Sequence, residues 1–389
     1  MSSLFTPLQL GSITISNRIG MSALTRNRST STVPNDVMKE YYVQRAKGKA
    51  GLIVSEGTLV TRQGSEWQDA PGIWNEAQVA AWKDITNAVH EAGSKMYCQA
   101  IGRVNHPDAP EQIAAGEVGH IQSPSVLSSD CLWKPVYAPS AISARGGKFR
   151  FLPGHPGYVQ PTEVPDPTTL IELYKQAAIN AKKAGFDGVE VHGANGYLVS
   201  QFLDYNSNKR TDKWGGSPEN RARFALETLK AVIEVYGRNV SIKLNPAGGY
   251  NDMGMPLQDT IDTYGYLLKE VDTLGLSYVT LVRYVEALDM EYDGKKRGTH
   301  HDVVETFKPF LKNTPLFING GVTPEEAEEL VSSGTAAGVF FGFPMVTHPD
   351  VGKRILDGIP LNNVPDLAHL YGARGVDRAL GYTDYKAAE

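Results

Sequence analysis

The sequence predicts an α/β protein built as a single (β/α)8 barrel, also called a TIM barrel. Eight short apolar runs alternate with stretches of helical periodicity, and most of the spacings suit βαβ units. A barrel with insertions spans about 250 to over 400 residues, so we expect residues 1–389 to form one domain. A doubly wound sheet is the alternative, but no strand is followed by the G-x-G-x-x-G turn of that fold.

The strands are predicted from short apolar segments at the expected spacing. Residues 8–15 read as a β-hairpin turning at Gly11-Ser12, which can cover the bottom of a barrel. In the fourth barrel strand, Val189 and Val191 alternate with polar residues and should be buried. The eight barrel strands are expected at Asn17–Arg26, Gly51–Gly57, Lys95–Ile101, Asp187–His192, Val240–Asn245, Tyr278–Val282, Leu316–Asn319 and Ala337–Phe341.

The helices are predicted from their caps and apolar stripes. Asn75 with Gln78 forms a capping box, and Gly93 ends that helix. Ser217-Pro218 begins a helix that runs to Tyr236. The segment Thr323–Glu326 reads as a second capping box with proline at its first helical position. Further helices are expected at residues 36–47, at about 167–184, and around the apolar stripe Ile261, Tyr264, Leu268 and Val271.

Residues 103–166 interrupt the alternation of strands and helices. The stretch is rich in proline and glycine and is too long for a structureless barrel loop. Its composition is not that of an independent core. We therefore expect an irregular excursion that caps the barrel mouth, and not a second domain.

Composition excludes several classes of protein. The net charge of -5 and the pI near 6.0 are not those of a protein that binds nucleic acid or an acidic membrane. The run Lys295-Lys296-Arg297 is expected to be a solvated loop, with contact to a dinucleotide phosphate as the alternative. No signal peptide or apolar run of ~18 residues is evident, and Cys98 and Cys131 make no disulfide framework. These features predict a cytoplasmic protein, and nothing points to a metal.

The segment that ends the fourth strand carries the clearest chemistry. Gly193 and Gly196 turn the chain, so His192, Asn195 and Tyr197 should be presented together at the C-terminal end of the strand. An imidazole and an amide can donate hydrogen bonds to one ligand oxygen, while a phenol can deliver a proton nearby. The structural alternative is that His192 and Asn195 only cap the following helix.

Because the C-terminal strand ends of a barrel share one face, polar residues from several strands should meet there. Gly320-Gly321 follows the seventh strand and Gly342 follows the eighth. Bare backbone amides at these turns can approach phosphate oxygens, although glycines can also serve as turn residues alone. A common pocket is expected to be surrounded by Thr25, Gln99, His192, Asn195, Lys243, Asn319 and Gly342.

The run HGANGYLVSQFLDYNSNKRTDKWGGSPENRARF, residues 192–224, resembles the signature of the Old Yellow Enzyme family, FMN-dependent ene-reductases on a (β/α)8 barrel. The resemblance extends from Leu4 to Tyr385. It implies a bound FMN and NADPH or NADH as a transient hydride donor. It also implies an activated alkene as the small-molecule substrate, with no nucleic-acid or membrane partner. Monomer and homodimer both remain open.

The resemblance assigns roles to individual residues. It implies that Thr25 bonds the flavin C4 carbonyl and that Gln99 lies on the flavin pyrimidine edge. His192 and Asn195 would grip the carbonyl or nitro oxygen of the substrate, and Tyr197 would donate a proton. Tyr371 would lie at the mouth of the substrate site, and its alternative role is to pack on the surface. The alternative role of Thr25 and Gln99 is to hydrogen-bond the backbone at the strand ends. Further cofactor positions implied are Ala23, Leu24, Gly57, Lys243, Gly320, Gly321, Gly342 and Phe343.

The sequence departs from the family pattern at four places. Lys243 stands where arginine is usual near the flavin N1 and O2, and Phe343 stands where arginine usually pairs with the FMN phosphate. Ala100-Ile101 replaces the usual Leu-Trp, and the segment of residues 372–381 is longer than usual.

Two alternative functions remain: a flavin-free barrel lyase or isomerase with a phosphorylated substrate, and a non-catalytic flavin-binding protein. The presence of His192, Asn195 and Tyr197 argues against the second.

Overall fold

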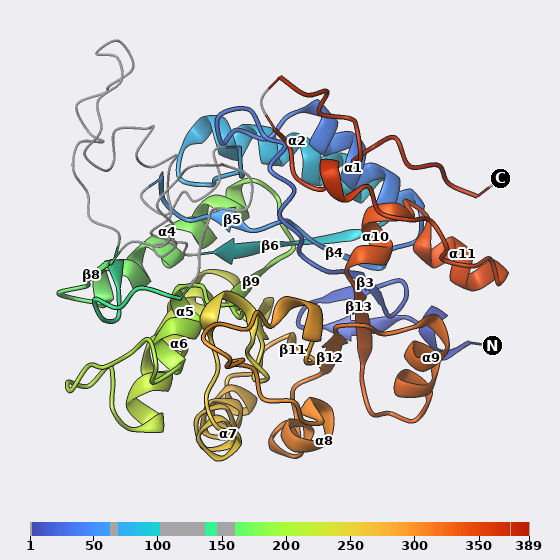
Figure 1. The fold of residues 1–389 in the computed structure, drawn as a ribbon. Coiled ribbons are helices and arrows are strands. Elements are labelled where there is room, and N and C mark those ends of the chain that lie inside the picture. The colour runs from blue at the N-terminus through green and yellow to red at the C-terminus, as the bar shows by residue number, and fades with distance from the viewer. Residues whose placement is uncertain (1, 63–68, 102–136, 146–159, 374, 389) are drawn as a thin grey trace, which may run out of the picture.

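The computed structural model describes residues 2–62, 69–101, 137–145, 160–373 and 375–388 (Figure 1). Most of the excursion expected at residues 103–166, including Cys131, lies outside the described residues. Of Ile101 only the backbone is described.

Eight parallel strands close into a ring, which confirms the predicted barrel and excludes the doubly wound alternative. The hydrogen-bonded order is β4-β3-β13-β12-β11-β10-β9-β6, and pairing of β4 with β6 closes it. A two-residue strand, β5 (Thr58–Leu59), adds to β6. The barrel strands are β3 (Ile19–Met21), β4 (Leu52–Val54), β6 (Lys95–Ile101), β9 (Gly188–Gly193), β10 (Val240–Leu244), β11 (Tyr278–Val282), β12 (Leu316–Asn319) and β13 (Gly338–Phe341).

The register brings polar side chains of neighbouring strands to the same height. Lys243 of β10 is paired with His192 of β9, and Gln99 of β6 is paired with Glu190. Side chains alternate between the two faces of a strand. Residues at even steps from these pairs therefore also point into the barrel.

The predicted hairpin is confirmed as β1 (Leu8–Leu10) and β2 (Ile13–Ile15), turning at Gly11 with a φ of 57°. Its Leu10 and Ile15 are fully buried in a cluster with side chains from the barrel strands. The hairpin therefore covers the bottom of the barrel. The barrel side of this cluster consists of Leu52, Val54, Tyr97, Tyr278, Phe317 and Phe340.

Strand β9 is buried on both faces. Val189 and Val191 belong to the large core between barrel and helices, as predicted. Glu190 is equally buried, and it accepts hydrogen bonds inside the barrel from the Tyr278 and Thr280 hydroxyls at 3.2 and 3.3 Å. The polar positions of this alternating strand therefore face the barrel interior, and none of them faces solvent.

Helices surround the ring of strands, as Figure 1 shows. The capping box at Asn75 and Gln78 is confirmed, and Ser217 accepts from the Asn220 amide. The second box is only half formed: Thr323 accepts from the Glu326 amide, but the Glu326 carboxylate pairs with Arg283. The α-helices are α1 (Asp36–Lys47), α2 (Glu76–Glu91), α4 (Thr168–Lys183), α5 (Leu198–Leu203), α6 (Pro218–Tyr236), α7 (Leu257–Thr273), α8 (Val303–Phe307), α9 (Pro324–Ser332), α10 (Phe343–Thr347) and α11 (Val351–Asp357).

The described parts of the excursion are anchored to the loop after α5. Strand β7 (Tyr137–Ala138) pairs in parallel with β8 (Thr162–Glu163). The buried Arg210 donates to the Val164 carbonyl at 2.8 Å and to the Glu163 carboxylate at 3.1 Å. Within the described ranges, no helix is long and apolar enough to cross a membrane.

Candidate active site

A pocket of about 370 Å³ opens at the C-terminal ends of the barrel strands. This volume lies within the roughly 300–1,000 Å³ of small-molecule sites. Arg26, Tyr250, Leu288, Val346, Leu367 and Leu370 are lining residues that the sequence did not indicate. Most of the predicted site residues also line it, namely Ala23, Leu24, Thr25, Gln99, His192, Asn195, Tyr197, Lys243, Phe343 and Tyr371.

The turn after β9 presents His192, Asn195 and Tyr197 to this pocket. The rings of His192 and Tyr197 lie 5.0 Å apart between centroids. Asn195 has a φ of 60°, a left-handed conformation that asparagine tolerates better than most residues. Gly196 follows at 78°, where a Cβ would lie 2.6 Å from the Asn251 Cβ. The backbone at this turn therefore requires glycine.

Neighbouring side chains fix the orientation of the Asn195 amide. The Asn245 Nδ2 donates to Asn195 Oδ1 at 3.1 Å, so the oxygen is turned toward β10. The Asn195 Nδ2 is then the atom left to act as a donor elsewhere. The first residue of α5 is Leu198 and its N-cap position is Tyr197, which makes no side-chain capping bond. Asn195 therefore lies two residues before the N-cap position of α5, and the capping alternative is wrong for this residue.

A buried polar group forms the floor of the pocket. Lys243 Nζ donates to Ser22 Oγ at 2.8 Å, and Gln99 Nε2 donates to Glu190 Oε1 at 2.9 Å. Burial raises the pKa of Glu190 while the Lys243 charge opposes that shift, and burial lowers the pKa of Lys243 while Glu190 opposes it. The two groups stabilise each other's charge inside the barrel. The floor therefore offers an ammonium and an amide to an electron-rich ligand.

Thr25 is positioned by the hydrogen bonds of the residue that follows it, Arg26. The Arg26 amide donates to the Glu56 carboxylate at 3.1 Å, and the Arg26 guanidinium donates to the Leu370 and Gly381 carbonyls at 2.8 and 2.6 Å. The last two bonds bring the C-terminal segment to the rim of the pocket. Neither Arg26 nor Glu56 was identified from the sequence, because their partners are distant along the chain.

Tyr371 lies at the pocket despite the longer C-terminal segment. It packs against the small cluster of Leu59, Ala70 and Tyr197. The Gly372 amide donates to the Arg26 carbonyl at 2.8 Å, which fixes the chain beside Tyr371. The alternative of a tyrosine packed only on the surface is therefore wrong.

The structure separates the glycine turns from this pocket. Gly320 and Gly321, at φ of 104° and 66°, line a neighbouring pocket together with Arg283. The Arg283 Nε donates to the Gly320 carbonyl at 2.9 Å, and its Nη2 lies 4.0 Å from a Cβ built on Gly321. Gly342 is the N-cap of α10 and Asn319 is bonded to the Phe340 carbonyl. Asn319 and Gly342, which were predicted to surround the common pocket, are therefore not among its lining residues. The same holds for Gly57, Gly320 and Gly321, which were predicted as further cofactor positions.

Comparisons with known proteins show which proteins this chain is similar to. The family model described as "NADH:flavin oxidoreductase / NADH oxidase family" matches residues 3–362. The chain is 38% identical to chanoclavine-I aldehyde reductase fgaOx3 of Penicillium roqueforti, over 99% of this chain and 96% of that protein. It is 36% identical to a protein of Epichloe festucae var. lolii named probable inactive reductase easA, over 92% of this chain and 90% of that protein.

The chain is also similar to solved structures over nearly its whole length. The Old Yellow Enzyme homologue of Zymomonas mobilis superposes with a TM-score of 0.82 at 32% identity, covering 99% of each chain. Morphinone reductase in complex with tetrahydroNAD gives a TM-score of 0.80 at 34% identity, covering 99% of this chain and 98% of that one.

Proposed function

The chain belongs to the NADH:flavin oxidoreductase / NADH oxidase family as a flavin-dependent oxidoreductase, and we propose that it is an ene-reductase that uses FMN. NADPH or NADH would be the hydride donor. The substrates would be α,β-unsaturated aldehydes, ketones or nitroalkenes. The observation that carries the proposal is that His192, Asn195 and Tyr197 line one pocket with Gln99 and Lys243.

The floor of the pocket suits the polar edge of a flavin. Bound FMN would supply the hydride chemistry. Gln99 and Lys243 would hold the pyrimidine edge of its ring, and Thr25 would bond its C4 carbonyl. Its phosphate would extend beyond the pocket lining, past Phe343, to the glycine turns, where backbone amides of Gly320, Gly321, Gly342 and Phe343 would hold it. Residues 1–389 would act as one FMN-binding domain. Ala23, Leu24 and Gly57 would complete the cofactor contacts.

The rim of the pocket suits an activated alkene. His192 and Asn195 would donate hydrogen bonds to the carbonyl or nitro oxygen, where negative charge develops during reduction. Donors that are already in place stabilise such charge as an oxyanion hole does. Tyr197 would hold the proton that is delivered to the α-carbon, and Tyr371 would border the entrance.

Cofactor content and turnover test the proposal together. We expect the purified protein to be yellow and to release one FMN per chain on denaturation. We also expect it to oxidise NADPH rapidly when cyclohexenone is added. A colourless protein that does not bind added FMN would contradict the cofactor assignment. A yellow protein that never reduces an enone would indicate an inactive relative, as the name of easA records for that protein.

Replacing both oxygen-binding residues tests the site itself. In His192→Ala with Asn195→Ala, we expect normal FMN content, no charge-transfer band with phenols, and a KM for enones raised at least about tenfold. Each hydrogen bond to a charged group is worth roughly 1.5–3 kcal/mol. Asn220→Ala, on the exposed start of α6, is the control. Phenol binding that survives the double substitution would mean that the pair is misassigned.

A further inference from the structure

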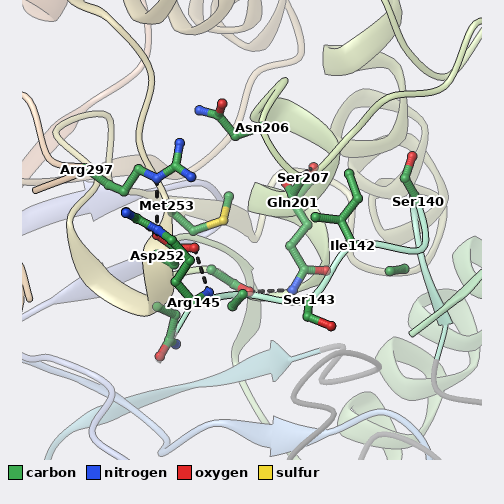
Figure 2. Close-up of a pocket in the computed structure, with 14 residues that line it drawn as sticks. Ser140, Ile142, Ser143, Arg145, Gln201, Asn206, Ser207, Asp252, Met253 and Arg297 are labelled. Carbon is green, nitrogen blue, oxygen red and sulfur yellow. Dashed lines mark hydrogen bonds and ion pairs between the residues drawn. The ribbon is translucent and has the colours of Figure 1, made fainter. Parts of the chain in front are cut away.

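A second, smaller pocket lies beside the candidate active site (Figure 2). Its volume is about 100 Å³, well below the roughly 300 Å³ at which whole small-molecule sites begin. It is therefore large enough for one group of a ligand whose remainder lies elsewhere. Its polar wall carries Arg145, Asp252 and Arg297, with Ser143 and Asn206 nearby.

Two guanidinium groups share a single carboxylate in this pocket. Arg145 donates to Asp252 Oδ1 through Nε at 3.0 Å and Nη2 at 2.8 Å, and Arg297 donates to the same oxygen through Nε at 3.1 Å (Figure 2). Asp252 is the one acidic residue among the described residues that line the pocket, so the lining carries a net charge of +1. An anion would therefore be attracted to it.

The Arg297 guanidinium has hydrogen-bond donors that a ligand can use. Among the described residues, its Nη1 and Nη2 atoms have no hydrogen-bond partner, and its side chain is 33% exposed. The Asp289 carboxylate accepts from the Arg297 and Gly298 amides and from the Tyr284 hydroxyl. A second acid near Arg297, the buried Asp204, accepts from the Asn206 and Gly254 amides. A planar guanidinium with two adjacent free N–H groups binds phosphate in a bidentate manner.

The small pocket and the candidate active site share a wall. Asn195 and Tyr250 line the active-site pocket, while their chain neighbours Gly196 and Asn251 line the small one. The Asn251 Nδ2 donates to the Asn195 carbonyl at 2.8 Å, which joins the two halves of that wall. A ligand whose reactive end lies at His192 and Asn195 could therefore extend over it.

We propose that Arg145 and Arg297 form a phosphate subsite for the dinucleotide that brings the hydride to the active site. The phosphate is either the 2′-phosphate of NADPH or the pyrophosphate that NADPH and NADH share. The inference rests on the proposed function. The residues of the basic run 295–297 then have different roles. Lys296 pairs with the exposed Glu286, whereas Arg297 reaches the pocket.

Direct binding tests the subsite without any turnover. Adenosine 2′,5′-bisphosphate, which has no nicotinamide, is titrated calorimetrically into the protein saturated with FMN. We expect Arg297→Gln to weaken binding by about tenfold or more, because it removes charge-assisted bonds. Lys296→Gln is the matched control and should bind as wild type does. Equal affinity in wild type and Arg297→Gln overturns the proposal.

The identity of the phosphate follows from the flavin-reduction half-reaction. A 2′-phosphate contact raises the dissociation constant of NADPH alone in Arg297→Gln, whereas a pyrophosphate contact raises those of NADPH and NADH alike. In both cases the limiting rate of flavin reduction and the reaction of 1-benzyl-1,4-dihydronicotinamide, which has no phosphate, stay unchanged. An enzyme that reduces enones but shows no change for either dinucleotide refutes the subsite while leaving the proposed function intact.

Asp252→Asn gives a test of opposite sign. The substitution removes the carboxylate charge but leaves both guanidinium groups, so we expect binding of the bisphosphate to tighten several-fold. Asp252 has a φ of 60°, which asparagine also tolerates. If the cluster served only to hold the loops together, Asp252→Asn would weaken binding as Arg297→Gln does, and that result would overturn the proposal.

Discussion

Tyr197 combines two roles that can be separated by experiment. It lines the active-site pocket, and its ring is buried against Leu59 and Ala70. Phenylalanine preserves the buried ring, so Tyr197→Phe tests the hydroxyl alone.

The sequence indicated Tyr197 because the motif around it is long and local. It did not indicate Glu190 or Arg26, because the partners of those residues, such as Gln99 and Gly381, lie far away in the chain.

We expect Tyr197→Phe to leave flavin reduction by NADPH unchanged and to slow enone reduction. A positioned proton donor is worth ~10²–10⁴ in rate. Nitroalkenes should suffer less, because a nitronate product can take its proton from water. Stopped-flow measurement of the two half-reactions is the test, and equal slowing of both would contradict the role.

Element boundaries were predictable where the cap is made by residues close in sequence. The ends of α6 match the prediction, and the Asn75 box begins α2. The Glu326 half of the second box failed because Arg283, on the loop after β11, offers the carboxylate a charged partner. The short helix α10 was not anticipated, and its first residue, Phe343, is 48% exposed in the pocket.

The start of α10 determines how firmly a cofactor phosphate can be held. Arg283, the cation beside Gly321, is already neutralised by Glu326, and Arg354 is bonded to Asp350 at 2.8 Å. An arginine at position 343 would add a charge-assisted bond worth roughly 1.5–3 kcal/mol. We therefore expect Phe343→Arg to tighten FMN binding by roughly 10–150-fold.

Riboflavin is the control for this substitution, because it lacks the phosphate and should bind both proteins equally. Dissociation constants from flavin fluorescence quenching provide the measurement. An unchanged FMN affinity in a folded Phe343→Arg protein would mean that another cation already pairs with the phosphate.

Across the whole molecule, the sequence predicted the ring of strands but not how the chain ends are secured. The alternation of apolar runs and helices determines the barrel, since each strand must be covered on its outer face. The C-terminal segment, red in Figure 1, runs beside α1. It is held by the buried Arg26, Arg28 and Arg45, which donate to the Gly381, Leu380 and Tyr382 carbonyls. Such contacts between distant segments leave no periodic pattern.

Glu56 lies at the centre of this region and couples global stability to pH. It accepts from the Arg26 amide and from the Tyr42 hydroxyl, and burial raises its pKa from 4.5 to about 7. Because the folded pKa lies above the unfolded one, the folded state binds the extra proton between these values. The free energy of unfolding that Glu56 contributes is therefore greatest below pH 4.5 and falls by about 3 kcal/mol as the pH rises through 7.

Glutamine at position 56 keeps the shape and cannot titrate, so Glu56→Gln should remove that part of the pH dependence. Urea unfolding of wild type and variant at pH 5 and pH 8, with FMN saturating in both, is the measurement. We expect the wild type to lose about 2.5 kcal/mol more than the variant between the two conditions. Other groups such as Glu190 titrate in both proteins and cancel in the comparison. Parallel pH profiles would show that Glu56 is already ionised in the folded protein at pH 5, stabilised by the Arg26 charge.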